Sequence, residues 1–322
     1  MQNILITSAG QRVSLVRAFQ KELKLIFPSA KVFTVDSNPL LAPACHVSDG
    51  YRIIGRVTGS DYVNELVSIC KELDIKLIIP TIDTELMILS ANKELLISKG
   101  IIPIISDLSF VEKCRDKRII NAFFTSNGIE IPKAVDKLNP TFPLFIKPYD
   151  GSLSQDIFLI KDQSQLQEYH LTNSKLMYME YINPANYDEF TVDAYYDKNG
   201  ELKCAVPRKR IFVRSGEINK GVTCKNEIVG YLKAKLSKIQ GAIGCLTIQF
   251  FYNSNSKRII GIEINPRFGG GYPLSYLARA NFPKWIIEEH ILGKEIPYFD
   301  SWENNLLMLR YDDEVLVYNY EE

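Results

Sequence analysis

The first third of the sequence alternates short apolar runs with amphipathic stretches, and this alternation limits the possible folds more than any other feature. Short apolar runs separated by helix-length segments are typical of a parallel β-sheet covered by helices. We therefore expect a doubly wound α/β lobe over residues 1–108. Its strands are predicted at 3–7, 31–35, 51–54, 77–80 and 101–105, and its helices at 13–24 and 62–73.

The pattern changes after residue 108, and residues 109–322 are predicted to form a second domain. A small α+β lid is expected over residues 135–182 or thereabouts, after a helix at 117–127. The lid strands are predicted at 144–147, 157–160 and 176–180. Strands joined by polar hairpin turns then indicate an antiparallel core sheet, closed by a C-terminal helix. These strands are predicted at 189–196, 202–207, 246–252 and 258–264, and the helix at 284–292.

The composition excludes several classes of partner. Lys and Arg together number 38, as do Asp and Glu, so the 322 residues carry a formal net charge of zero and give no bulk electrostatic reason to expect nucleic acid or an anionic membrane. No apolar run approaches the roughly 20 residues that a membrane span needs. The six cysteines are scattered without a CxxC pair, which argues against a zinc site or a disulfide framework. These features predict a cytoplasmic protein.

The loop after the first predicted strand is a poor match to a dinucleotide site. It reads Ser-Ala-Gly-Gln-Arg and contains one glycine, Gly10, where the dinucleotide fingerprint needs three. Asp36 stands where a ribose-binding acid would lie, but an aspartate after a strand is more often a turn residue. We therefore do not expect a nicotinamide enzyme, and we expect this lobe to be a scaffold that contributes at most substrate contacts.

The predicted hairpin at 246–267 carries the most informative polar side chains. Glu263 and Asn265 are two residues apart on one strand, so they project from the same face about 6.6 Å apart at the backbone. Gln249 lies beside them if the 253–256 turn sets the strand register. One carboxylate and two amides on one face suit Mg²⁺, which prefers oxygen donors and often keeps substrate phosphates as further ligands. The simpler interpretation is a solvent-facing side of an amphipathic strand.

The residues directly after this hairpin favour the functional interpretation. Gly269, Gly270 and Gly271 are consecutive, which is costly in a purely structural strand end but suits a loop that lies close to a ligand. Arg267 adds a planar cation that can hold a transferring phosphoryl group or a substrate carboxylate.

Upstream, Lys147 ends a predicted strand just before the small-residue loop Asp-Gly-Ser-Leu-Ser at 150–154. The lysine supplies charge and the loop supplies N–H groups, which together can form a phosphate cradle. Taken alone, Lys147 and Lys117 are each more typical of a solvated surface charge than of a binding site. The functional interpretation depends on the whole set occurring in this order.

Order and spacing of these motifs resemble the ATP-grasp superfamily, in particular the ATP-binding half of the carbamoyl phosphate synthase large subunit and related small carboxylate–amine ligases. The likeness covers nearly the whole chain and includes VDSNP at 35–39 and IPTIDTE at 79–85. It implies an α/β ATP-grasp fold with a doubly wound pre-ATP-grasp lobe, a small α+β lid and an antiparallel-sheet core lobe. Glu-Ile-Asn-Pro-Arg at 263–267 is its most specific mark.

The resemblance also implies roles for particular residues. The residues that it implies at the ATP phosphates are Lys117, Lys147, Gly151, Ser152 and Ser154. Those that it implies at adenine and ribose are Glu180, Tyr181, Ile182 and Glu189. It assigns to one or two Mg²⁺ ions, or to Mn²⁺, the ligands Gln249, Glu263 and Asn265. Arg267 and Lys147 would be catalytic, and Arg208 or Arg210, with Arg214, would approach the substrate unless these charges are simply solvated.

The predicted function is an ATP- and Mg²⁺-dependent ligase that activates a small-molecule carboxylate as an acyl phosphate for attack by an amine. A homodimer is compatible with it. Two alternatives stay open, namely a kinase that leaves a stable phosphorylated product and a non-catalytic nucleotide-binding module. The single glycine of the lid loop favours the second alternative. The chain has one ATP-grasp unit, so complete carbamoyl phosphate synthesis is not expected.

Overall fold

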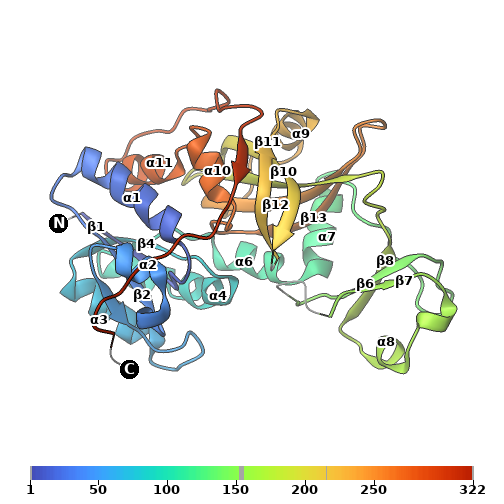
Figure 1. The fold of residues 1–322 in the computed structure, drawn as a ribbon, viewed down its shortest axis with the longest axis horizontal. Helices are drawn as coiled ribbons and strands as arrows, with labels where there is room; N and C mark the ends of the chain where they lie inside the picture. Colours follow the sequence, from blue (N-terminus) through green and yellow to red (C-terminus); the bar gives the residue numbers. More distant parts are fainter. Residues whose placement is uncertain (1, 152–155, 215, 321–322) are drawn as a thin grey trace.

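The computed structural model describes residues 2–151, 156–214 and 216–320. These residues form three parts, which are an N-terminal lobe with a parallel sheet, a core lobe with an antiparallel sheet, and a small lid (Figure 1). The predicted fold class is thereby confirmed. Ser152 and Ser154, two of the residues expected at the ATP phosphates, lie outside the described residues.

The N-terminal lobe is the doubly wound sheet that the sequence pattern predicts. Its five strands are ordered β3-β2-β1-β4-β5 and all pairs are parallel. The strands are β1 Asn3–Thr7, β2 Val32–Asp36, β3 Tyr51–Ile53, β4 Ile75–Ile79 and β5 Ile102–Pro103. The helices are α1 Val13–Ile26, α2 Pro43–Val47, α3 Tyr62–Glu72, α4 Asp83–Ala91 and α5 Lys93–Ser98. All five residues of the central strand β1 are buried, as expected of a strand covered on both faces.

The lid follows two helices, α6 Leu108–Arg115 and α7 Lys117–Ser126. It is a three-stranded antiparallel sheet ordered β7-β6-β8, with one short helix. Its elements are β6 Leu144–Pro148, β7 Phe158–Ile160, α8 Glu168–Thr172 and β8 Leu176–Glu180. The lid has its own small core, built around Leu144, Ile146 and Tyr178.

The core lobe is a six-stranded sheet ordered β13-β12-β9-β10-β11-β14, with antiparallel pairing throughout. Its strands are β9 Asp188–Tyr196, β10 Leu202–Arg214, β11 Glu217–Thr223, β12 Gly244–Tyr252, β13 Ile259–Asn265 and β14 Leu307–Leu309. Its helices are α9 Glu227–Lys235, α10 Tyr272–Leu277 and α11 Phe282–His290. In the core lobe the sequence pattern missed β11, α9, α10 and β14. Strand β11 reads EINKGVT, which lacks apolar alternation, so its pairing with β10 and β14 makes it a strand.

One hydrophobic core joins the N-terminal lobe to the core lobe. Phe19 of α1 meets Phe268 edge to face at 5.9 Å between ring centroids, and the same cluster includes Tyr272 and Phe282. The chain after β14 runs back toward the side of the N-terminal lobe (Figure 1). The first lobe and the core lobe therefore pack as a continuous body, while the lid has a separate core.

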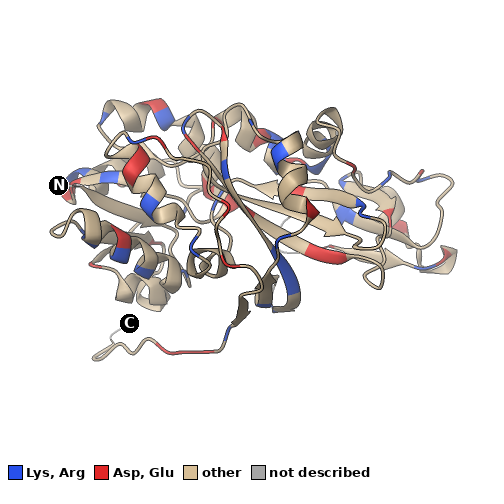
Figure 2. Cartoon of the chain, turned by 90° about the horizontal axis from the view of Figure 1, so that it is seen from above, with Lys and Arg blue, Asp and Glu red and all other residues tan. Residues whose placement is uncertain are grey.

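Basic and acidic residues are interspersed over all three parts (Figure 2). Within the described ranges, no helix is long and apolar enough to cross a membrane. The even distribution of charge agrees with the formal net charge of zero, so charge-driven binding must depend on local groups.

Candidate active site

A cavity of about 850 Å³ opens where the three parts of the chain meet. The N-terminal lobe lines it with the loops that follow β1 and β4, including Arg12 and Asp83. The lid contributes Lys147, and the core sheet contributes β9, β10, β12 and β13. A cavity of this size can hold a nucleotide or a substrate of similar bulk.

The three predicted metal ligands converge in the structure. Gln249 on β12 is directly opposite Glu263 on β13, and Thr247 is opposite Asn265. Gln249 Nε2 donates to Glu263 Oε1 at 2.7 Å, and Asn265 Nδ2 donates to the same oxygen at 2.9 Å. The strand register thus brings one carboxylate between two amides, as the alternation along the hairpin predicts.

This donor set fits Mg²⁺ better than zinc. Each amide presents an oxygen instead of a nitrogen after a half-turn, and the assignment of these two atoms follows the hydrogen-bond network. Glu263, Gln249 and Asn265 can then offer three oxygens to a hard cation, with phosphate oxygens as further ligands. Among the described residues, no group of three His, Cys, Asp or Glu side chains could hold a metal. The fit therefore depends on the two amides.

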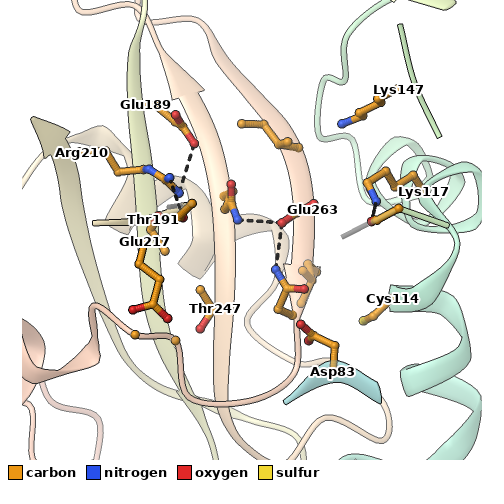
Figure 3. Close-up of a pocket in the computed structure, with 18 of the residues that line it drawn as sticks. Asp83, Cys114, Lys117, Lys147, Glu189, Thr191, Arg210, Glu217, Thr247 and Glu263 are labelled. Carbon is orange, nitrogen blue, oxygen red and sulfur yellow. Dashed lines mark hydrogen bonds and ion pairs between the residues drawn. The ribbon is translucent and has the colours of Figure 1, made fainter. Parts of the chain in front are cut away.

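Lys147 and Lys117 lie on one side of Glu263 (Figure 3). Lys147 is buried on β6, and burial lowers its pKa to about 8, against the opposing attraction of Glu263 and Glu189. Lys117 begins α7, and its Nζ donates to the backbone oxygen of Gly151 at 2.5 Å. Lys147 of the lid and Lys117 of α7 therefore both line the cavity, and Lys117 contacts the loop after β6 at Gly151.

The residues expected at adenine and ribose also line the cavity. Glu180, Tyr181 and Ile182 occupy the end of β8 and the chain beyond it. Glu189 on β9 forms an ion pair with Arg210 at 3.4 Å, and burial raises the pKa of Glu189 although Arg210 opposes this. These residues line the same cavity as Phe251 and Ile262 of the core sheet.

Arg267 lines the cavity but is held by the N-terminal lobe. Its Nη2 donates to Asp83 Oδ2 at 2.7 Å, and Asp83 is the first residue of α4. The sequence pattern did not predict this partner, although Asp83 lies in the IPTIDTE segment that belongs to the family resemblance. An aspartate at the carboxyl end of a parallel strand is the signal that could have identified it.

The three arginines expected near the substrate have different surroundings. Arg208 is 1% exposed and forms a two-bond ion pair with Asp193, at 2.7 and 2.9 Å. Arg210 lines the cavity beside Glu189. Arg214 does not line this cavity; it lies on the exposed end of β10 and pairs with Asp312 at 2.5 Å. Arg208 and Arg210 therefore both line the cavity with their charges paired, whereas Arg214 lies outside it.

The three consecutive glycines make room for side chains of the protein itself. A Cβ on Gly269 would lie 3.0 Å from Thr247 Oγ1, and one on Gly270 would lie 2.2 Å from Glu217 Oε2. A Cβ on Gly271 would lie 2.1 Å from Arg208 Nη1. The sequence predicts that this loop lies close to a ligand. In the structure the glycines are needed for another reason, because side chains of the protein occupy the space that their Cβ atoms would fill. Glycine lets Glu217 and Arg208 approach the backbone at the cavity wall.

Replacing Gly271 with alanine should disturb the buried Arg208 pair. Because the new Cβ would overlap the guanidinium, we expect Gly271→Ala to lower the free energy of unfolding by about 1–3 kcal/mol. Gly230→Ala is the matched control, since a Cβ at this position in α9 meets nothing within 4 Å. The control should gain about 0.5–1 kcal/mol from higher helix propensity. Urea denaturation measures both values, and equal shifts for the two variants would contradict the overlap.

Comparison with known proteins identifies the class. Residues 172–311 match the family model described as ATP-grasp in the biosynthetic pathway with Ter operon, and residues 4–105 match the model PylC-like, N-terminal domain. The fold is that of ATP-grasp proteins, with an ATP-grasp family match over residues 172–311 and a PylC-like match over the N-terminal lobe. No curated protein matches the chain.

Solved structures share the fold at low sequence identity. Biotin carboxylase from Campylobacter jejuni, in a β-γ-ATP complex, superposes with a TM-score of 0.74 at 15% identity, over 95% of this chain and 74% of that one. N5-carboxyaminoimidazole synthetase from Staphylococcus aureus, complexed with ADP, gives 0.70 at 18% identity, over 96% and 80%. The biotin carboxylase domain dimer of the Hydrogenobacter thermophilus 2-oxoglutarate carboxylase, with MgADP, ADP and bicarbonate, gives 0.74 at 17%, over 94% and 73%.

Proposed function

We propose that this protein is an ATP- and Mg²⁺-dependent ligase, which activates a carboxylate as an acyl phosphate for attack by an amine and releases ADP and phosphate. The observation that carries this proposal is the convergence of Gln249 and Asn265 on one oxygen of Glu263, with Lys147 in the same cavity. The structural neighbours solved with ADP or MgADP support a nucleotide at this place.

ATP fits the part of the cavity between the lid and the core sheet. Lys147 and Lys117 would bind its phosphates, with Gly151 beside them. Glu180, Tyr181 and Ile182 would contact adenine, and Glu189 would contact ribose. Because Lys147 is buried, its charge acts in a low-dielectric environment and stabilises phosphate oxygens more strongly than a surface lysine would.

Glu263, Gln249 and Asn265 would hold Mg²⁺, which when bound neutralises charge on the phosphates. The protein groups then orient the reaction. Lys147 holds the γ-phosphate while the substrate carboxylate attacks it, so an O–P bond forms to the carboxylate and the bond to ADP breaks. Arg267 and Arg210 are placed to orient the carboxylate. An amine then attacks the acyl carbon, phosphate leaves, and the amine loses a proton to give an amide.

The sequence motifs resemble carbamoyl phosphate synthase, whereas the structural neighbours described above are biotin carboxylases and an N5-carboxyaminoimidazole synthetase. A homodimer is proposed because the Hydrogenobacter neighbour is described as a dimer. A cytoplasmic location is proposed because all six cysteines are free thiols in the structure, which suits a reducing compartment.

Trapping with hydroxylamine tests the proposed reaction directly. Purified protein is incubated with Mg·ATP, a panel of carboxylic acids and hydroxylamine, which converts an acyl phosphate into a hydroxamate. We expect hydroxamate and ADP in equal amounts with at least one carboxylate. A stable phosphorylated product that forms without any amine would instead identify a kinase. Retention of ATP with no ADP release across the panel would identify a nucleotide-binding module.

A further inference from the structure

Three charged side chains meet beside the N-terminal lobe, and two of them, Arg12 and Glu217, line the large cavity. Arg12 Nη1 donates to Glu217 Oε1 at 2.8 Å, and Arg310 Nη1 donates to Glu217 Oε2 at 3.3 Å. Arg12 directly precedes α1, Glu217 begins β11, and Arg310 directly follows β14. We name these three residues the Arg-Glu-Arg cluster. No step of the proposed reaction uses these three residues.

The cluster lies where a doubly wound sheet normally binds a ligand. In the N-terminal lobe the strand order reverses between β1 and β4, and ligands bind outside the carboxyl ends of strands at such a point. The loops after these two strands line the cavity with Arg12, Thr81 and Asp83. The lobe therefore reaches the cavity, where it can make the substrate contacts that the sequence analysis allows for it.

The cluster also lies away from the proposed phosphate site. Glu217 and Arg210 are on the opposite side of Glu263 from Lys147 and Lys117 (Figure 3). A molecule that contacts Glu217 would therefore approach the reacting centre from the side opposite to the ATP phosphates. The ATP phosphates do not take up this side, so the second substrate, the amine, can approach from it.

Charge distinguishes the cluster from its neighbours. Arg208 is balanced by Asp193, Arg267 by Asp83 and Arg210 by Glu189, one carboxylate for each arginine. In the Arg-Glu-Arg cluster a single carboxylate serves two arginines, which leaves one positive charge in excess. Glu217 is ionised, because Arg12 and Arg310 outweigh the effect of burial and hold the pKa of its carboxyl below the usual value. The excess charge is therefore present at neutral pH.

The two arginines keep donors available for a ligand. In the part of the chain that the structure describes, Arg12 uses only Nη1, and Arg310 uses only Nη1, toward Glu217 and the backbone oxygen of Ile218. Their side chains are 20% and 35% exposed. A small adjoining cavity of about 20 Å³ is lined by both arginines and by Ser14 of α1. The remaining N–H groups can reach a bound anion, because arginine offers five in a planar fork.

We propose that the Arg-Glu-Arg cluster binds an anionic group of the amine substrate, so that the acceptor is an amine carrying a carboxylate or phosphate. This inference rests on the proposed ligase function and adds the chemical class of its second substrate. Arg12 and Arg310 bind the anion, and Glu217 holds the two guanidinium groups at a fixed spacing. Ammonia and neutral amines lack the group that the cluster recognises.

Calorimetric titration tests the subsite without requiring turnover. The probes are 2-aminoethyl phosphate and glycine, each compared with an uncharged counterpart, ethanolamine or glycinamide. We expect at least one anionic probe to bind about tenfold or more tightly than its counterpart, since a charge-assisted bidentate contact is strong. The preferred probe tells whether phosphate or carboxylate is the natural group. Equal affinity within each pair, or no binding of any probe, would overturn the proposal.

Two variants and one control assign the preference to the cluster. Arg12→Gln and Arg310→Gln should each remove it, whereas Arg52→Gln should keep it. Arg52 is the matched control, since it also forms an exposed ion pair in the N-terminal lobe, with Glu72 at 2.6 Å. Thermal unfolding confirms that each variant is folded. If either cluster variant is folded and retains the full preference, the assignment is wrong.

Hydroxylamine separates this inference from the proposed function. It is uncharged at neutral pH and carries no anion, so its reaction with an acyl phosphate needs no anion subsite. Formation of hydroxamate by the wild-type protein therefore reports carboxylate activation alone. Absence of hydroxamate in the wild-type protein would defeat the proposed function, while the calorimetric result would still decide whether the anion subsite exists.

Discussion

Glu263→Gln should abolish ATP-dependent ADP formation while leaving the fold intact. The substitution keeps the shape of the side chain but removes the one carboxylate from a set whose other members are the amides Gln249 and Asn265. Three neutral donors bind a divalent cation poorly, because Mg²⁺ selects charged oxygen ligands. A bound metal stabilises the transition state by several kcal/mol, so a loss on the order of 10³-fold in kcat is expected.

Coupled detection of ADP at saturating ATP and Mg²⁺ measures this effect. Glu72→Gln is the matched control, because Glu72 forms an exposed ion pair with Arg52 and neither residue lines the cavity. This variant should keep full activity. The unfolding midpoint of Glu263→Gln should stay at or near that of the wild type. Undiminished turnover in Glu263→Gln would refute the assignment of this hairpin as the metal site.

Lys147→Met should stabilise the free protein and at the same time remove most of its activity. Lys147 is 9% exposed, and burial penalises its charged form. Methionine fills a similar volume without a charge, so at pH 7 we expect the free energy of unfolding to rise by about 1–3 kcal/mol. The same change removes a preorganised cation from the phosphates, which should reduce kcat by roughly 10²–10³-fold.

The stability gain of Lys147→Met should depend on pH with a defined sign. The pKa of Lys147 is about 8 in the folded protein and 10.5 when unperturbed, so between these values the unfolded chain binds more protons. Stability of the wild type therefore rises with pH across this window, and the advantage of the variant shrinks as pH increases from 8 toward 10.5. Urea denaturation at pH 7, 8.5 and 10 gives this comparison, and a constant difference would show that burial does not perturb Lys147.

The hairpin site could be predicted because it depends on local rules. Alternation along a strand places Glu263 and Asn265 on one face, whereas Gln249 comes opposite Glu263 only because the pairing shifts by one residue between Gln249 and Phe250. The parallel first sheet and the antiparallel core sheet follow from the same reasoning, since the spacing of apolar residues reports the period of a strand or a helix. Lys147 and Glu189 also reach the cavity as the family resemblance implies.

The partners of the charged residues could not be predicted in this way. Arg208 lines the cavity, but the sequence did not predict its partner Asp193. Arg214 was expected near the substrate, but it pairs with Asp312 outside the cavity. Strand β11 shows the same limitation, since its side chains do not alternate and its neighbours in the sheet define it.

The sequence by itself determined the two kinds of sheet and the shared strand face of Glu263 and Asn265, because short-range periodicity is a property of neighbouring residues. The tertiary structure alone decided that Arg12, Glu217 and Arg310 form one charged cluster and that Asp83 holds Arg267. These contacts join residues on separate elements, and their approach depends on how the N-terminal lobe packs against the core sheet through α1, α10 and α11. Local patterns carry no information about that packing.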